Sequence, residues 1–326
     1  MPCYNEEAFI ADALNSLVDD YVRQNAEFLI LDGGSTDATR DIVNAFASTG
    51  IPLRLLDNKM RFQVFGLNRA IAEARGEIIV RTDAHSLFPP GYVRECVEIL
   101  RRTGAAGVGG VMRPRGTTPV QKAIALAMQH PLGVGNAKFH LGRHSGYVDT
   151  FYLGTYPKAI FDEVGLFDTR CRTNEDAELN LRIRQHGKRV YLAGGLEVTY
   201  FPRKSFRALA AQYFRYGRGR AYTTMKHRQF TSVRQIIPIV LVLALAGAVL
   251  LSPWKPILLG FVAAYLLLLT GGALFLRRGE AAPLKTRLLA VPAFALMHNA
   301  WGAGFLSYLL FPGKKHGESE ATAGEA

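Results

Sequence analysis

The chain has 326 residues, of which 49% are hydrophobic and 20% charged, and its formal net charge is +12. This length and composition suit one or two folded domains and exclude a chain that is disordered throughout. The positive charge suits a nucleic acid, an anionic membrane surface or a phosphorylated ligand as partner. The three cysteines are far apart and have no metal-ligand spacing, which favours reduced thiols on the cytosolic side: Cys3, Cys96 and Cys171.

Up to about residue 204, short apolar runs alternate with helical patterns. This alternation predicts an α/β domain whose sheet is mostly parallel and covered by helices on both faces. The strands are expected over 27–32, 52–57, 77–83 and 189–193. The helices are expected over 8–22, 36–47 (capped by Thr36 or Asp37), 64–75 (stopped by Gly76), 91–104 (stopped by Gly104) and from Thr173 or Asn174 to Gly187.

The basic residues gather in the segment 203–234, which has no Asp or Glu and stands directly before an apolar region. A basic belt in this place is attracted by the anionic cytoplasmic leaflet of a membrane. Nucleic acid is the less favoured partner, because no nucleic-acid-binding motif accompanies the belt. Its members are Arg203, Lys204, Arg207, Arg215, Arg218, Arg220, Lys226, Arg228 and Arg234.

Three apolar stretches follow the basic belt, at 236–252, 256–276 and 288–311. The first two predict a transmembrane hairpin that turns at 253–255. The third contains Pro292 and His298 and suits an interfacial or re-entrant helix as well as a third span. A buried helical core of a soluble protein is the alternative for all three. With the basic loop 277–287, the positive-inside rule places the preceding domain in the cytoplasm.

These observations predict four parts of the chain. They are an α/β domain over 1–204, a basic amphipathic juxtamembrane segment over 205–235, two to three transmembrane helices over 236–312 and a disordered tail over 313–326.

Two carboxylates, Asp32 and Asp83, are expected at the carboxyl ends of strands. In an open parallel sheet these ends meet at one crevice, where ligands bind. Asp32 precedes a glycine-containing turn and a helix, so its carboxylate can accept hydrogen bonds from a nucleotide base or from the hydroxyls of a ribose. Capping of the helix is the alternative interpretation.

The tripeptide Asp83-Ala84-His85 places a carboxylate and an imidazole on the same side of an extended chain. Together they suit Mn²⁺ or Mg²⁺, with coordination positions left for the oxygens of a diphosphate. The alternative is a capping aspartate beside a surface histidine, because the pattern is common by chance.

Three acidic residues, Glu175, Asp176 and Glu178, fall in the first turn of the predicted helix that ends at Gly187. Complementarity to the helix dipole explains acidic first turns in general. The same positive helix end also keeps a carboxylate ionised, and an ionised carboxylate can accept a proton from a sugar hydroxyl.

Four stretches in this order, "PCYNEE", "LDGGSTDAT", "RTDAH" and "NEDAELNLRI", resemble the inverting family-2 glycosyltransferases of the GT-A fold, whose domain binds nucleotide sugars. The chain is most similar to the membrane-attached bacterial branch of the succinoglycan type. Further stretches that carry this resemblance are "GVGNAKFHLGRHSGYVDTFYLGTYPKAIFDEVGLFD", "QYFRYGRGRA" and "MHNAWGAGFL".

The resemblance implies roles for individual residues. Asp83 and His85 match the metal-binding D-x-D motif in a D-x-H form, which leaves the metal preference open, and Asp176 matches the general base. "QYFRY" resembles the Q-x-x-R-W motif of processive synthases, although an interfacial helix with snorkelling arginine is an equal alternative. The implied nucleotide-binding residues are Pro2, Tyr4, Asn5, Glu6, Asp32, Arg81, Gln212 and Arg215.

The resemblance further implies an inner-membrane, multi-pass enzyme with a cytoplasmic catalytic domain and a divalent metal, Mn²⁺ or Mg²⁺. It would transfer sugar from a nucleotide-diphosphate sugar, for which UDP is the expected nucleotide, to a polyprenyl-diphosphate-linked glycan in exopolysaccharide synthesis. A processive polysaccharide synthase and a non-catalytic nucleotide-sugar-binding membrane protein are the alternatives. Because the family has a full apolar strand before "PCYNEE" and only Met1 stands there, we also expect a start codon further upstream.

Overall fold

The computed structural model describes residues 1–142, 144–230, 232–275 and 282–312. The chain divides into two compact units, Met1–Pro202 and Arg203–Ala326. The expected disordered tail over 313–326, the last residue of the second apolar stretch (276) and residues 277–281 of the basic loop lie outside the described residues.

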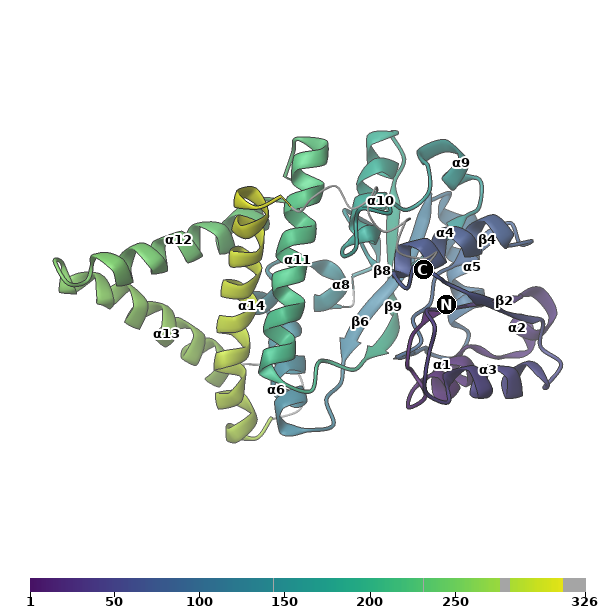
Figure 1. Cartoon of the computed structure of the whole chain (residues 1–326), viewed down its shortest axis with the longest axis horizontal. Helices are drawn as coiled ribbons and strands as arrows, with labels where there is room; N and C mark the ends of the chain where they lie inside the picture. The colour runs from purple at the N-terminus through teal and green to yellow at the C-terminus, as the bar shows by residue number, and fades with distance from the viewer. Residues whose placement is uncertain (143, 231, 276–281, 313–326) are drawn as a thin grey trace, which may run out of the picture. The chain divides into compact units, whose positions relative to one another are not determined.

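The first unit begins with a three-stranded parallel sheet in the order β1-β2-β3, made of Pro2–Cys3, Phe28–Asp32 and Leu53–Asp57. Both longer strands were expected from their apolar runs. The helices of this part are α1 (Ile10–Leu17), α2 (Asp20–Asn25), α3 (Thr39–Ala47) and α4 (Gln63–Glu73). Figure 1 shows these elements at the N-terminal end of the chain.

The helix predicted over 8–22 is in fact two helices, α1 and α2. Asp19 causes the break, because its backbone is extended and its side chain accepts a hydrogen bond from the Val22 amide at 2.8 Å. A new helix therefore starts at Asp20, as an aspartate N-cap favours.

A second sheet has the order β4-β8-β6-β9-β5, with β7 paired to β9. Its strands are Ile78–Val80 (β4), Ser86–Leu87 (β5), Gly107–Pro114 (β6), Gly146–Val148 (β7), Tyr152–Pro157 (β8) and Val190–Tyr200 (β9). Within it only β6 and β9 run parallel; the other four pairs are antiparallel. The expectation of a mostly parallel sheet is therefore wrong for this half. The sequence prediction covered only the strands over 77–83 and 189–193 in this half, whereas β8 pairs antiparallel with both β4 and β6.

The helices of this half are α5 (Tyr92–Thr103), α6 (Pro119–Met128), α7 (Pro131–Val134), α8 (Lys138–Leu141), α9 (Ile160–Val164) and α10 (Glu175–Gln185). Helix α5 buries an apolar stripe with helical spacing that includes Tyr92, Cys96 and Leu100. It ends at Gly104 as the sequence predicts, because that residue has a left-handed φ of 61°.

A cavity of about 330 Å³ is lined mostly by apolar side chains from elements that include α2, β2, α4, β4 and α5. The amino group of Met1 faces Leu29, to whose carbonyl oxygen it donates a hydrogen bond of 2.8 Å. Burial lowers the pKa of this amino group to about 6.

The second unit is helical. It contains α11 (Phe206–His227), a 3-10 turn (Val233–Gln235), α12 (Ile236–Leu251), a second 3-10 turn (Pro256–Leu258), α13 (Leu259–Leu274) and α14 (Leu284–Leu310). Helices α11 and α14 lie side by side (Figure 1). Glycines permit this close approach: a Cβ atom on Gly217 would lie 2.0 Å from the carbonyl oxygen of Trp301, and one on Gly304 would lie 2.1 Å from that of Phe214.

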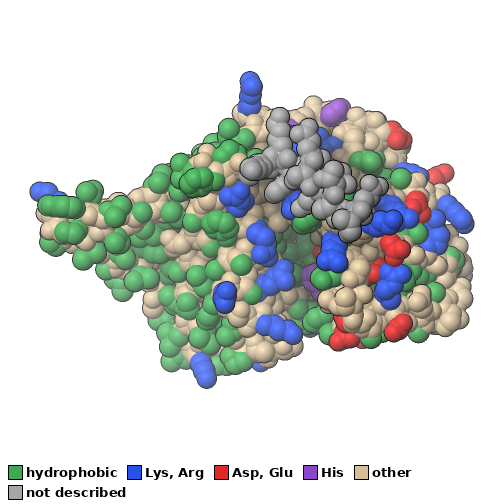
Figure 2. Space-filling model, viewed as in Figure 1, with side chains coloured by type: hydrophobic (Ala, Val, Ile, Leu, Met, Phe, Trp, Pro, Cys, Tyr) green, Lys and Arg blue, Asp and Glu red, His purple; other side chains and the backbone are tan. Residues whose placement is uncertain are grey.

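Among the residues that the structure describes, two helical segments are long and apolar enough to cross a membrane, Pro256–Leu274 and Leu284–Leu310. The first expected span gives a helix of only 16 residues, α12, which ends before Pro253 and is shorter than the roughly 20 residues that a span needs. The stretch around Pro292 is part of one continuous helix, α14, and its place in a membrane or at its surface stays a prediction. The surface of α12 and α13 is covered by apolar side chains, as Figure 2 shows.

Candidate functional site

The carboxylate of Asp32 lies at the carboxyl end of β2, where the chain turns toward α3. Only 1% of the residue is exposed. One oxygen accepts a hydrogen bond of 2.5 Å from the Ser35 hydroxyl, and the other contacts Arg40 Nη1 at 2.6 Å. Burial acts to raise the pKa of Asp32, but the hydrogen bonds from Ser35 and Arg40 outweigh burial and hold that pKa below its ordinary value. Asp32 is therefore a fixed anion.

The loop after β1 packs against this turn through hydrogen bonds from its backbone and side chains. Asn5, whose φ is 53°, donates from its amide to Ser35 Oγ at 2.9 Å and accepts from the Thr36 amide at 2.8 Å. A Cβ on Gly33 would lie 3.4 Å from Tyr4, so the two loops touch. The expected nucleotide residues Pro2, Tyr4, Asn5 and Asp32 thus lie together at one end of the parallel sheet.

Glu6 joins this loop to the Asp83–His85 segment. Its Oε1 lies 2.9 Å from Nδ1 of His85. A carboxylate at Nδ1 favours the tautomer with hydrogen on Nδ1 and the lone pair on Nε2, which is the arrangement common behind metal-binding histidines. The sequence assigns Glu6 to the nucleotide; the structure shows its contact with the predicted metal ligand.

Arg81 lies at the end of β4 and gathers three carboxylates. Its Nη2 is 2.8 Å from Glu175 Oε1 and 3.7 Å from Asp83 Oδ1, and its Nη1 contacts Asp176 Oδ1. Only 6% of the Arg81 side chain is exposed. Gln63 Nε2 donates to Asp83 at 3.2 Å. Residues far apart along the chain thus form one charged cluster at the start of α10.

Asp176 is the member of the cluster whose ionisation is most perturbed. Burial raises its pKa to about 7, the negative charges of Glu175 and Asp83 act in the same direction, and Arg81 opposes them. A carboxylate whose pKa is near neutrality is partly ionised at physiological pH, and its ionised form is a stronger base than an ordinary carboxylate. Of the acidic residues in this first helical turn, Asp176 is the one whose pKa is raised toward neutrality, and its role as a general base stays a prediction.

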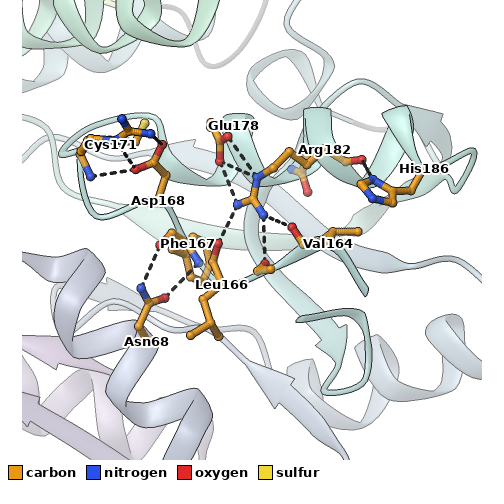
Figure 3. A network of polar contacts seen from close by, with 12 residues as sticks. Asn68, Val164, Leu166, Phe167, Asp168, Cys171, Glu178, Arg182 and His186 are labelled. Atoms are coloured by element: carbon orange, nitrogen blue, oxygen red, sulfur yellow. Dashed lines mark hydrogen bonds and ion pairs between the residues drawn. The ribbon is translucent and has the colours of Figure 1, made fainter. Parts of the chain in front are cut away.

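Glu178, the third acidic residue of this turn, has a structural partner instead. Arg182 contacts Glu178 Oε2 at 2.9 Å and donates to the carbonyl oxygens of Val164, Gly165 and Leu166, as Figure 3 shows. The next residue, Phe167, is held by both polar atoms of the Asn68 side chain. These contacts fix the loop that leads into α10 and so fix where Glu175 and Asp176 stand.

The remaining predicted residues, Gln212 and Arg215, lie on α11 in the second unit. Gln212 is buried and donates to the Tyr216 hydroxyl at 2.9 Å, and Arg215 is exposed. Their contact with a donor stays a prediction. The sequence interpretation missed Arg40, Gln63 and the ion-pair role of Arg81. A signal for Arg81 existed, since a charged residue directly after an apolar strand is rarely buried without a partner.

The side chains of Asp83 and His85 suit a divalent cation by their chemistry. A carboxylate oxygen and an imidazole nitrogen are both ligands of Mn²⁺, and the Glu6 carboxylate at Nδ1 of His85 holds the imidazole in one orientation. Within the described ranges, no group of three His, Cys, Asp or Glu side chains could hold a metal ion. Asp83 and His85 therefore stay the predicted metal ligands.

Comparison with known proteins identifies the chain's family. The family model described as "Glycosyl transferase family 2" matches residues 1–165. The chain belongs to glycosyltransferase family 2. The succinoglycan biosynthesis protein ExoA of Rhizobium meliloti (strain 1021) is 35% identical to it over 95% of this chain and 94% of ExoA. A dolichyl N-acetyl-alpha-D-glucosaminyl phosphate 3-beta-D-2,3-diacetamido-2,3-dideoxy-beta-D-glucuronosyltransferase of Methanococcus voltae is 28% identical over 67% of this chain and 70% of that protein.

Solved structures establish the fold of this family-2 glycosyltransferase. The mannosyltransferase PcManGT from Pyrobaculum calidifontis, in complex with GDP-Man and Mn²⁺, superposes with a TM-score of 0.60 at 24% identity and covers 94% of this chain and 85% of that chain. The S. aureus TarS 1–349 complex with UDP-GlcNAc gives a TM-score of 0.51 at 15% identity, with 95% and 90% covered. The α/β fold is GT-A, as the sequence motifs predict, and the expected family and enzyme class are confirmed.

Proposed function

We propose that this glycosyltransferase transfers a sugar, with inversion, from a nucleotide-diphosphate sugar to a hydroxyl group of a lipid-linked saccharide. The observation that carries the proposal is the cluster in which Asp83 and Asp176 contact the same guanidinium of Arg81. It brings a candidate ligand for the donor's diphosphate and a candidate base for the acceptor next to each other.

The donor side of the reaction would use the loops at the end of the parallel sheet. Tyr4, Asn5 and Asp32 would contact the base and ribose, since Asp32 is an anion fixed at the end of β2. Asp83 and His85 would hold Mn²⁺ or Mg²⁺, and the diphosphate would complete the coordination. Such a cation, when bound, neutralises the charge that develops on the departing nucleotide diphosphate.

The acceptor side would use Asp176. Its carboxylate removes the proton from the acceptor hydroxyl as the oxygen attacks the anomeric carbon from the face opposite the diphosphate. The C–O bond to the acceptor forms while the C–O bond to the diphosphate breaks, so an α-linked donor gives a β-glycoside. The protein supplies orientation, a base and electrostatic stabilisation, and it forms no covalent bond to the sugar.

A lipid-linked acceptor and an inner-membrane location are supported by two observations. The apolar surface of α12 and α13 includes Ile237, Leu250 and Leu267, which are 63%, 71% and 72% exposed. Exposed apolar helices of this kind suit the interior of a bilayer. The related M. voltae transferase has a dolichyl-linked sugar phosphate in its name. Multi-pass attachment with a cytoplasmic catalytic unit and a polyprenyl-diphosphate acceptor belong to the same proposal.

The test compares the full chain with its Asp176→Asn variant in membranes, across a panel of UDP- and GDP-sugars and with a polyprenyl-diphosphate sugar as acceptor. We expect the variant to bind the donor as the wild type does and to transfer about 10²- to 10⁴-fold more slowly, the usual contribution of a general base. Asp162→Asn is the matched control, because Asp162 is an exposed first-turn aspartate of α9. Transfer by Asp176→Asn at the wild-type rate, or a product with retained configuration, contradicts the mechanism.

A further inference from the structure

Arg81 has an uncommon environment for a charged side chain. It follows the apolar strand β4, its amide donates to the Gly154 carbonyl oxygen at 3.0 Å, and its guanidinium is almost fully buried. Such burial is costly unless the charge is compensated. Here the compensation comes from Glu175, Asp176 and Asp83.

The contacts of the guanidinium leave little capacity for a phosphate. Both terminal nitrogens face carboxylates, Nη1 toward Asp176 and Nη2 toward Glu175 at 2.8 Å and Asp83 at 3.7 Å. An arginine that binds a diphosphate normally presents two donors of its planar fork to the phosphate oxygens. To do so, Arg81 would have to leave two buried carboxylates without a counter-charge, which is strongly unfavourable.

We propose that Arg81 is a positioning residue for Asp176, the base assigned under the proposed function, and that it does not bind the donor. The guanidinium contacts Oδ1 of Asp176, which leaves Oδ2 as the oxygen that receives the acceptor's proton. The same guanidinium also reaches Asp83. It therefore fixes the base relative to the side chain proposed to hold the donor's cation, and this separation determines whether the attacking oxygen lines up with the anomeric carbon.

Glu175 completes the arrangement as the second anchor of the guanidinium. Its Oε1 lies 2.8 Å from Nη2, closer than Asp83 at 3.7 Å, and its side chain is only 10% exposed. With Arg81 held from the Glu175 side, the guanidinium cannot rotate without losing one of two buried ion pairs.

The test measures donor affinity and turnover separately in Arg81→Gln and Arg81→Lys, with the full chain in membranes and Mn²⁺ present. Donor affinity is measured with the UDP- or GDP-sugar that the wild type uses. We expect both variants to bind the donor with a Kd within about twofold of the wild type. The kcat of Arg81→Gln should fall about 10²-fold. The kcat of Arg81→Lys should be about tenfold higher than that of Arg81→Gln, because lysine keeps the charge but lacks the planar pair of donors. Arg54→Gln is the control, because Arg54 is a partly buried arginine that pairs with Glu27 and Glu73 away from this cluster.

A tenfold or larger increase in donor Kd with an unchanged kcat overturns the proposal and makes Arg81 a donor ligand. If Arg81→Gln does not fold, the double variant Arg81→Gln/Glu175→Gln removes one charge of each sign. It is expected to fold, bind donor and turn over slowly, and normal turnover by it also overturns the proposal. Absence of transfer by the wild type with every donor overturns the proposed function and this assignment together, whereas normal kcat in Arg81→Gln with an active wild type overturns this assignment alone.

Discussion

Glu6 and His85 form a direct side-chain contact, 2.9 Å between Oε1 and Nδ1, although 79 positions separate them in the chain. The contact ties the loop after β1 to the segment that follows β4. It gives Glu6 a place behind a predicted metal ligand, whereas the sequence motif groups Glu6 with the nucleotide-binding residues. The two roles lead to different expectations for a Glu6 variant.

Glu6→Gln is expected to weaken Mn²⁺ binding about 10- to 100-fold, the usual cost of losing a carboxylate that supports a metal-binding histidine. The measurement is a Mn²⁺ titration of the full chain followed by electron paramagnetic resonance, without donor. Glu7→Gln is the matched control, since Glu7 is the neighbouring carboxylate and accepts from the Ala38 amide. If Glu6→Gln binds Mn²⁺ with wild-type affinity but binds the donor more weakly, Glu6 is a nucleotide-binding residue, as the sequence motif implies.

The rate of transfer should depend on pH through Asp176. The base must be ionised, and burial raises its pKa to about 7. The value of kcat/KM is therefore expected to rise about tenfold per pH unit below pH 7 and to level off above it, because kcat/KM reports the ionisation of the free enzyme. The profile is measured from pH 5 to 9 at fixed ionic strength.

The variant Glu175→Gln tests whether Asp176 is the group behind this pH dependence. The negative charge of Glu175 raises the pKa of Asp176, so its removal should lower that pKa and move the midpoint of the profile to lower pH. A midpoint that moves upward, or a rate that is flat across this range, would show that another group limits the reaction.

Much of the first unit can be predicted from local patterns. Strands β2 and β3 and helix α5 have apolar periodicities long enough to identify them, and Gly104 ends α5 because its φ is positive. The mixed second sheet could not be predicted in the same way. Its strand β8, Tyr152–Pro157, pairs with β4 and β6 through contacts between distant parts of the chain, and a strand's own sequence does not specify its direction.

In the candidate site, too, single residues can be predicted from local sequence, whereas their contacts depend on distant parts of the chain. The motifs predict Asp83, His85 and Asp176 as site residues one by one, because each was expected at or just after a strand end or at a helix start. The cluster itself depends on Arg81, whose hydrogen-bonded partner Glu175 is 94 positions away. Which of the carboxylates in the first turn of α10 faces Arg81 depends on the rotation of the helix, and Glu178 faces Arg182 instead.

Close packing of α11 on α14 should make Gly217 intolerant of any side chain. A Cβ there would lie 2.0 Å from the Trp301 carbonyl oxygen, so Gly217→Ala is expected to destabilise the second unit by about 1–3 kcal/mol. Thermal unfolding in detergent measures the effect. Gly271→Ala is the control: its Cβ meets nothing within 4 Å, and alanine favours a helix by about 1 kcal/mol over glycine. Equal melting temperatures for both variants would contradict the close packing.

The ion pair of Arg182 with Glu178 should be essential for the stability of the first unit. The two side chains are 13% and 0% exposed, so Arg182→Met takes the guanidinium away from a buried carboxylate and three carbonyl groups. We expect a loss of about 3–5 kcal/mol, seen as a lower melting temperature of the full chain, and partial recovery in Arg182→Met/Glu178→Met, because the apolar pair no longer buries a carboxylate that has lost its ion pair with Arg182. Arg94→Met is the control, since its contact with Glu98 is 3.9 Å long and exposed and should contribute at most about 1 kcal/mol. If Arg182→Met melts no lower than Arg94→Met, the loop before α10 is held by other contacts.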